Sequence, residues 1–256
     1  MARTKKNSNK INSKLNSKTN SKTNNSTKLS KIHKEQPIDI EFEAKFLDID
    51  KNKLIEKLKS LGAKLKQSNT LYKRSMFGLC DVKKGYVRVR DEGDKITMTS
   101  KIYKDSKFPQ EFEIIIKDDF EKGRAFLQSL NLNEKAYHET MREKWNLSLG
   151  KSPKNNCEIA FDCIPGIPMY VEVECKSHKN LTKAIKLLGL TNHKKLYGAY
   201  GKTYVEYYGM TENDINNTIP KLTFKNIKEE LKTYIKKNAE LLQDVSRQHL
   251  EIHSKI

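Results

Sequence analysis

The stretch Ile40-Glu41-Phe42-Glu43-Ala44-Lys45-Phe46 alternates apolar residues with two acids and a base. Because successive side chains of an extended strand point to opposite faces, Glu41, Glu43 and Lys45 share one face and the apolar residues share the other. At roughly 3.3 Å per residue the two carboxylates begin about 7 Å apart, so their tips can converge on one divalent cation. Taken alone, the same alternation also describes an antiparallel strand with a solvated charged face.

The alternation recurs in six further segments. Their charged positions are Arg88 and Arg90 in 85–90, Lys101 in 97–101, Glu111 and Glu113 in 111–114, Arg142 and Lys144 in 140–145, Asp162 in 159–162, and Glu172 and Glu174 in 169–174. Ordinary protein surfaces mix both signs of charge, whereas most of these segments carry mainly one. The recurrence favours one shared functional face over a set of unrelated solvated faces.

Strands that alternate along their whole length are typical of an antiparallel sheet. Closing such a sheet into a barrel of about eight strands would place the charged faces inside, with room for side chains and one small ligand. An interior lined by both signs is costly unless a polyanion and a cation match it, so function is a reason for the pattern. The sequence therefore predicts an α+β fold with a closed antiparallel β-barrel flanked by short helices.

Helical spacing of apolar residues follows three of the acidic strands. We expect helices from a cap at Asp48 or Asp50 to Gly62, over about 119–130, and through 181–188 to Gly189. Residues from about 225 to 252 predict one long amphipathic helix, which either packs on its own domain or binds a partner or a second copy of the chain. The predicted organisation is a basic tail at 1–36, a catalytic domain at 37–222 and a C-terminal helix at 223–256.

The net charge of +18 is unevenly spread along the 256 residues. Residues 1–36 hold nine lysines and Arg3 against Glu35 alone, and they repeat Asn-Ser-Lys three times with almost no apolar residues. A segment that cannot bury apolar surface is expected to be disordered. It either attracts RNA or is a solvated tail with no fixed role. The basic remainder favours polyanionic partners.

The four cysteines have neither CxxC spacing nor the density of a secreted disulfide scaffold, which favours a reducing, cytoplasmic location. No apolar run approaches the roughly 18 residues that a bilayer crossing needs, so we expect no membrane partner. The six histidines lack paired ligand spacing, and the glycines form no GxxxxGK loop. A zinc site and a P-loop nucleotide site are therefore not predicted.

Six motifs in order resemble the CYTH family, the triphosphate tunnel metalloenzymes. They are the ExExK pattern at 41–45, GYVRVRDEG at 85–93, ITMTSK at 96–101, the acids at 111 and 113, the basic strand at Arg142, and Asp162 followed by EVE at 172–174. The resemblance runs from about residue 38 to 222, and the arrangement is similar to bacterial proteins described as class IV adenylyl cyclases. It implies a tunnel of antiparallel strands in which metal-dependent triphosphate chemistry takes place.

The resemblance also implies roles for individual side chains. Mg²⁺ or Mn²⁺ would be held by Glu41, Glu43, Glu172 and Glu174, with Asp162 and the acids at 111 and 113 assisting. The triphosphate would be gripped by Lys45, Arg88, Arg90, Lys101, Arg142 and Lys202. Lys45 and Tyr72 are the catalytic candidates for orienting water. Two alternatives stay open, since Arg74 could reach the tunnel instead of Tyr72, and Lys194 or Lys195 could replace Lys202.

Phosphoryl transfer depends on positioning and on neutralising charge, so this constellation serves two reactions. If water attacks, the enzyme is a triphosphatase acting on an inorganic, nucleoside, thiamine or RNA 5′-triphosphate, and we place this reaction first because it needs no base or ribose pocket. If the ribose 3′-hydroxyl of ATP attacks, the enzyme is an adenylyl cyclase and pyrophosphate leaves. A non-catalytic module that binds polyanions or RNA is the second alternative.

Overall fold

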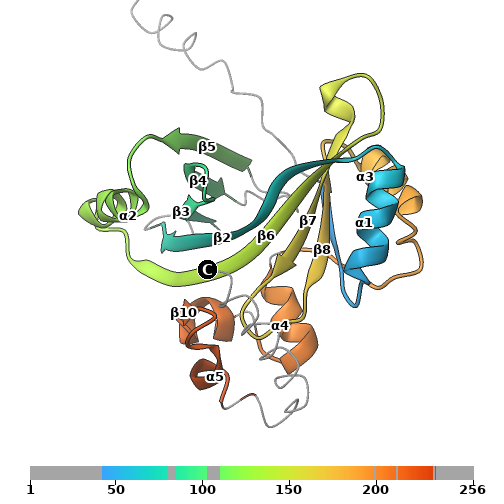
Figure 1. Ribbon diagram of the computed structural model, residues 1–256. Coiled ribbons are helices and arrows are strands. Elements are labelled where there is room, and N and C mark those ends of the chain that lie inside the picture. The colour runs from blue at the N-terminus through green and yellow to red at the C-terminus, as the bar shows by residue number, and fades with distance from the viewer. Residues whose placement is uncertain are drawn as a thin grey trace, which may run out of the picture. The chain divides into compact units, whose positions relative to one another are not determined.

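The structure is a computed structural model that describes residues 42–79, 85–102, 110–198, 200–211, 213–232 and 234 (Figure 1). The predicted tail at 1–36 and the predicted metal ligand Glu41 lie outside the described residues. Among the described residues, no helix has the length and apolarity that crossing a bilayer requires. The proposed domain boundaries at 36/37 and 222/223 stay predictions.

In the part of the chain that the structure describes, one large sheet contains ten strands. They are β1 (Phe42–Phe46), β2 (Lys64–Gly78), β3 (Gly85–Asp91), β4 (Ile96–Ile102), β5 (Gln110–Ile116), β6 (Glu134–Ser148), β7 (Asn156–Cys163), β8 (Tyr170–Cys175), β9 (Lys195–Leu196) and β10 (Lys221–Leu222). The order is β5-β4-β3-β2-β6-β7-β8-β1-β9, all antiparallel, and β10 joins β6 in parallel. The α+β class and the antiparallel sheet are confirmed. We had expected a closed barrel; among the described residues β5 and β9 are the two edge strands of the sheet and do not pair with each other.

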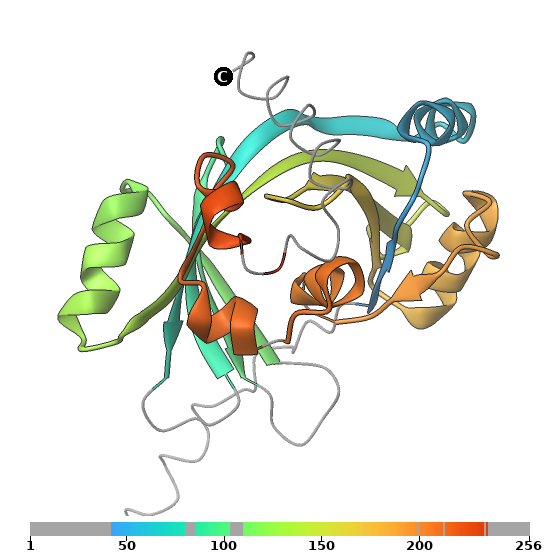
Figure 2. The ribbon, with the colours of Figure 1, turned by 90° about the horizontal axis from the view of Figure 1, so that it is seen from below.

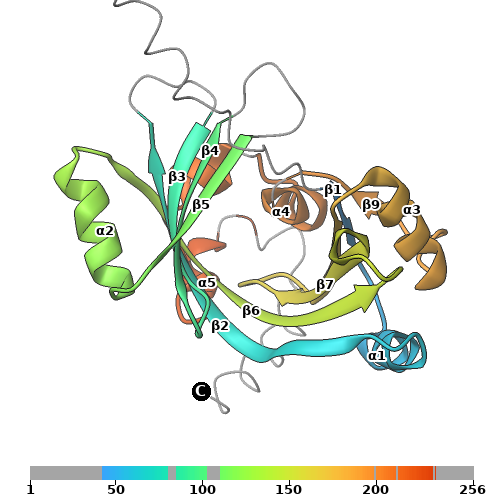
Figure 3. The ribbon, with the colours of Figure 1, turned by 90° about the horizontal axis from the view of Figure 1, so that it is seen from above.

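The sheet is strongly curved because β2 and β6 are long, 15 residues each, and bend along their length (Figure 2). Register shifts interrupt the pairing of these two strands, which is where such bends form. As a result β3–β5 and β1 lie on opposite sides of a common interior (Figure 3). The charged faces of the strands therefore meet in this interior.

Among the described residues, five α-helices accompany the sheet: α1 (Lys51–Ser60), α2 (Phe120–Ser129), α3 (His178–Leu187), α4 (Gly201–Tyr208) and α5 (Ile227–Glu230). The first three confirm the helices predicted from apolar spacing. Asp50 caps α1 by accepting from the backbone N–H groups of Asn52 and Lys53, both at 3.1 Å, and Asp119 caps α2 in the same way. Asp50, and not Asp48, is therefore the cap.

Two of the apolar clusters formed by the described residues pack helices against the outer face of the curved sheet. The larger one packs α1 and α3 against β1, β7 and β8, with Phe46, Ile159 and Val173 fully buried. The smaller one packs α2 against β3, where a Cβ added to Gly123 would come within 2.9 Å of Val89 and Ile116. These clusters hold the outer faces, so the alternating charged residues must face inward.

A disulfide joins Cys157 on β7 to Cys175 on β8, with their Cα atoms 4.4 Å apart. The cysteine pattern, which favoured a reducing location, did not anticipate this bond, because the pairing depends on strand register and not on cysteine spacing. Of the predicted C-terminal helix, the described residues contain α5 and a turn at 231–232. Most of the predicted range lies outside them.

Candidate active site

The interior holds a cavity of about 580 Å³ whose lining residues are mostly charged, with several tyrosines among them. Among the described residues, its basic lining residues are Lys45, Arg74, Arg88, Arg90, Lys95, Lys101, Lys135, Arg142 and Lys144. The acidic ones are Glu43, Glu92, Glu111, Glu113, Glu158, Asp162, Glu172 and Glu174. Most of the predicted site residues thus line one cavity. Lys202 does not, because it lies on α4 with its side chain exposed.

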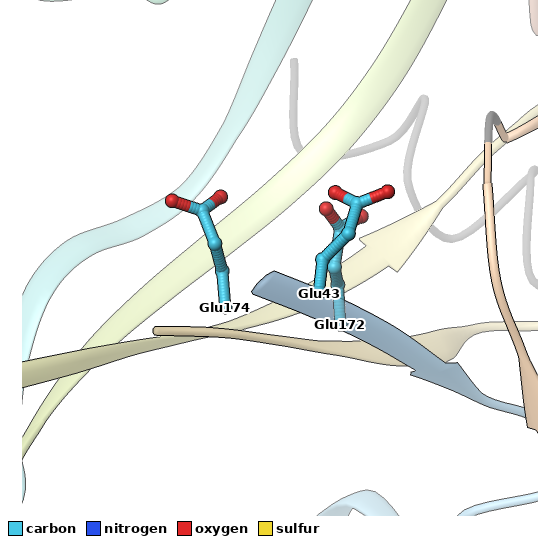
Figure 4. A group of neighbouring side chains, drawn as sticks. All are labelled: Glu43, Glu172 and Glu174. Atoms are coloured by element: carbon cyan, nitrogen blue, oxygen red, sulfur yellow. The ribbon is translucent and has the colours of Figure 1, made fainter. Parts of the chain in front are cut away.

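Three carboxylates gather where β1 pairs with β8. Register places Glu43 opposite Glu174 and Lys45 opposite Glu172. One carboxylate oxygen from each of Glu43, Glu172 and Glu174 lies within 4.8 Å of the others, and Figure 4 shows the three side chains on the same side of the two strands. Carboxylate oxygens are hard ligands, which Mg²⁺ and Mn²⁺ prefer.

The acids in this cluster are crowded. Burial, and then the neighbouring Glu172, raise the pKa of Glu43 from 4.5 to about 7. Burial acts in the same direction on Glu172, but Lys45 and Arg142 outweigh it and hold the pKa of Glu172 well below its usual range. One proton shared by the pair thus relieves part of the repulsion, and a cation would relieve it more completely. The residues present therefore fit a divalent ion.

Lys45 is almost fully buried beside these acids. Its ammonium donates to Glu43 Oε1 at 2.8 Å and to the carbonyl of Gly198 at 2.7 Å, and it lies 3.7 Å from Glu172 Oε2. The Gly198 contact ties the segment before α4 to β1. Lys45 is thus held between the acidic cluster and the Gly198 carbonyl.

The opposite wall is basic and comes from β3 and β4. Arg88 donates to Thr99 Oγ1 at 3.2 Å and lies 3.7 Å from Glu113, but its buried Nε has no hydrogen-bond partner among the described residues. Burial, and then the neighbouring Arg90, lower the pKa of Arg88 to about 10. A lowered guanidinium pKa indicates a cation that lacks sufficient negative charge around it.

Lys101 shows that the two walls face each other. It pairs with Glu111 at 2.6 Å on the neighbouring strand, and its charge also helps to lower the pKa of Glu172 on β8. Because β4 and β8 are far apart in the order of the sheet, this interaction acts across the cavity.

Asp162 and Arg142, which both line the cavity, form a bidentate pair. The Arg142 Nε and Nη2 atoms donate to the two Asp162 oxygens at 2.7 and 2.6 Å, and Glu172 Oε2 lies 3.4 Å away. Asp162 was predicted as a metal ligand. In the structure both Asp162 oxygens accept hydrogen bonds from Arg142, so Asp162 orients the Arg142 guanidinium.

Tyr72 lines the cavity but does not contact Lys45, its predicted partner, in any described hydrogen bond. Its hydroxyl donates to Gln67, and its ring lies 5.5 to 5.9 Å from the cationic groups of Lys144, Arg90 and Arg142. Arg74, the alternative, also reaches the cavity, where its guanidinium stacks on Tyr200 at 4.2 Å. Both candidates therefore line the interior.

Several lining residues were not assigned from the sequence. Glu158 shares the alternation of Asp162, and Glu92 continues that of Arg88 and Arg90 past the end of β3. Counting positions of the same parity beyond each motif would have found both. Tyr200 carried no such signal, because it lies in a turn and not in a strand. Lys144 was placed on the same face as Arg142 but was given no role.

No family model matches the sequence. A Methanocaldococcus jannaschii protein, an adenylate cyclase candidate, is 30% identical to this chain over 155 residues, which are 58% of this chain and 83% of that protein. This chain belongs to the CYTH family. An adenylate cyclase candidate of Vibrio parahaemolyticus matches its structure with a TM-score of 0.54 at 9% identity, over 64% of this chain and 97% of that one.

A Pyrococcus horikoshii protein matches with a TM-score of 0.50 at 20% identity, over 64% of this chain and 98% of that one. At these identities the two structures support the CYTH fold alone. The chain is thus a CYTH protein with the inward-facing charged strands that its motifs predicted.

Proposed function

We propose that this CYTH protein hydrolyses a triphosphate inside the charged cavity with the help of a divalent cation. The observation that carries the proposal is that each wall of the cavity holds a charged group whose charge is incompletely balanced by its neighbours. Glu43 has a raised pKa on the acidic wall, and Arg88 has a lowered pKa and an unpartnered Nε on the basic wall. A polyanion and a cation bound together would match both walls at once.

The cation would be held by Glu43, Glu172 and Glu174, whose carboxylate oxygens already lie within 4.8 Å of one another. When bound, Mg²⁺ or Mn²⁺ would polarise the scissile phosphoryl group and neutralise charge on its oxygens. Glu43 must lose its shared proton for this, and its pKa of about 7 puts that loss in the physiological range.

The phosphate chain would lie along the basic wall. Arg88, Arg90 and Arg142 offer guanidinium donors, and Lys101 offers a point charge opposite the acidic cluster. These fixed donors would stabilise charge on the phosphate oxygens as the terminal P–O bond breaks, and they need little reorganisation because ion pairs already hold them. A water molecule would attack the terminal phosphorus and transfer its proton to the surrounding acids or solvent, releasing orthophosphate and a diphosphate.

Cyclisation of ATP is the second candidate. It is favoured by the M. jannaschii relative, which is named as an adenylate cyclase candidate. The same walls would bind the triphosphate, but the ribose 3′-hydroxyl would attack the α-phosphorus and pyrophosphate would leave. Hydrolysis asks less of the observed residues, since it requires no group to position a ribose.

Incubating the full chain with ATP, tripolyphosphate, thiamine triphosphate and 5′-triphosphate RNA, with Mg²⁺ or Mn²⁺, separates these reactions. Orthophosphate indicates hydrolysis, whereas cyclic AMP with pyrophosphate indicates cyclisation. Glu43→Gln should abolish either reaction, while Glu134→Gln, which alters an ion pair with Arg124 outside the cavity lining, should retain it. Full turnover by Glu43→Gln would contradict the proposed metal site.

A further inference from the structure

Glu92 is a buried carboxylate at the end of the basic wall, and the roles given above do not use it. It directly follows β3, and its side chain is 1% exposed. Its Oε1 accepts from Arg90 through Nε at 2.8 Å and through Nη2, and from the Thr97 hydroxyl at 3.4 Å. Its Oε2 lies 3.4 Å from Lys144 Nζ and 3.7 Å from Lys95 Nζ. One carboxylate thus gathers three cations.

The backbone of Glu92 is tied down as well. Its N–H donates to the carbonyl of Lys95 at 2.9 Å, which closes the turn between β3 and β4. Its carbonyl accepts from Gln67 Nε2 at 2.6 Å, and Gln67 accepts in turn from the Tyr72 hydroxyl. Glu92 therefore connects β2, β3 and β6 at the place where their inward-facing residues meet.

The Glu92 carboxylate stays ionised despite its burial. Burial would raise its pKa, but Arg90, Lys144 and Lys95 outweigh burial and lower it to about 2. Glu92 is thus ionised across the working pH range and offsets the mutual repulsion of the three cations. The contacts of Arg90 with Glu92 use Nε and Nη2, so no described hydrogen bond occupies Arg90 Nη1.

We infer that Glu92 is a positioning residue, which fixes Arg90 and Lys144 in the geometry in which they receive the phosphate chain. The inference rests on the proposed function, and Glu92 acts through these two bases without touching the substrate. If Glu92 instead competed with phosphate for Arg90, its removal would strengthen binding. The two roles predict opposite changes in affinity.

The test measures binding of tripolyphosphate to the full chain by calorimetry at fixed Mg²⁺, beside turnover and thermal unfolding. We expect Glu92→Gln to weaken binding about tenfold, the effect of displacing one charge-assisted contact. Glu134→Gln is the matched control, because it changes a carboxylate paired with Arg124 outside the cavity lining and should leave binding unchanged. Unchanged or tighter binding by Glu92→Gln would overturn the inference.

Two further variants separate positioning from a purely structural effect. Glu92→Asp keeps the negative charge but moves the carboxylate away from Arg90 and Lys144, because the side chain is one methylene shorter. This variant should therefore also weaken binding. Wild-type affinity in Glu92→Asp would show that Glu92 only balances charge and does not position these bases. In an Arg90→Ala background, Glu92→Gln should cost clearly less than in the wild type, whereas full additivity would show that Glu92 does not act through Arg90. If the wild type itself neither binds nor turns over any triphosphate, the proposed function fails, independently of Glu92.

Discussion

The raised pKa of Glu43 predicts that the ionisation needed for cation binding lowers the free energy of unfolding. In the folded chain without cations it is raised from 4.5 to about 7, so the folded state retains a proton that the unfolded chain loses. Stability should therefore fall as the pH rises from about 4.5 to about 7, and the loss should be complete above that range. Glu43→Gln cannot ionise, so it should not show this loss.

The size of the effect follows from the two pKa values. The difference between 4.5 and about 7 corresponds to about 3 kcal/mol. Because the Glu43 side chain is 32% exposed, solvent screens part of this, and we expect about 1 to 2 kcal/mol. The variant should gain that much stability relative to the wild type between pH 4.5 and pH 8.

Urea unfolding of both proteins with a chelator, at several pH values, measures this difference directly. Taking the variant minus the wild type cancels the titration of groups that the two proteins share. At pH 8, added Mn²⁺ should stabilise the wild type by binding the folded state, and should stabilise Glu43→Gln much less. A difference that does not vary with pH, or equal stabilisation by Mn²⁺, would refute the crowding of Glu43 and Glu172 as we describe it.

Three further predictions concern other parts of the chain. Asp162→Asn should lower the free energy of unfolding by about 3 kcal/mol, because it leaves the buried Arg142 without its bidentate partner, and urea unfolding would show this. Lys101→Ala should weaken tripolyphosphate binding about tenfold by removing a base that faces the acidic cluster, and should also lower the thermal unfolding temperature because Glu111 loses its partner at 2.6 Å; calorimetry and thermal unfolding measure the two effects. Deleting residues 1–36 should leave turnover nearly intact while weakening any retention on RNA, and lost turnover would contradict an accessory role.

Alternation with a period of two accounts for most of what the sequence could predict. It placed Arg88, Arg90, Glu172 and Glu174 on inward faces because the pleat leaves no other choice once the opposite face is apolar. It could not predict which charges would meet. The Arg142–Asp162 pair depends on the register of β6 and β7, which places these two residues directly opposite each other and which neither motif encodes by itself.

The prediction for Lys202 shows a different limit. We expected a phosphate contact there, but residues 201–208 form α4, in which Thr203, Tyr204 and Tyr208 are buried. At about 100° per residue, position 202 falls on the opposite side of the helix from these three. Reading the segment as helical, with Tyr204 and Tyr208 four residues apart, would have placed Lys202 outside the cavity.

The ion pairs inside the cavity explain how such a charged interior can fold before any ligand binds. Arg142 with Asp162, Lys101 with Glu111 and Arg90 with Glu92 each satisfy a buried charge locally, which removes most of the desolvation penalty. The compensation is incomplete at Glu43 and Arg88, on opposite walls, and those are the sites from which a cation and a phosphate would gain most. Folding and binding therefore rely on the same charges. The ion pairs fix the geometry of the cavity, and Glu43 and Arg88, whose charges are incompletely compensated, contribute most of the affinity for a cation and a phosphate.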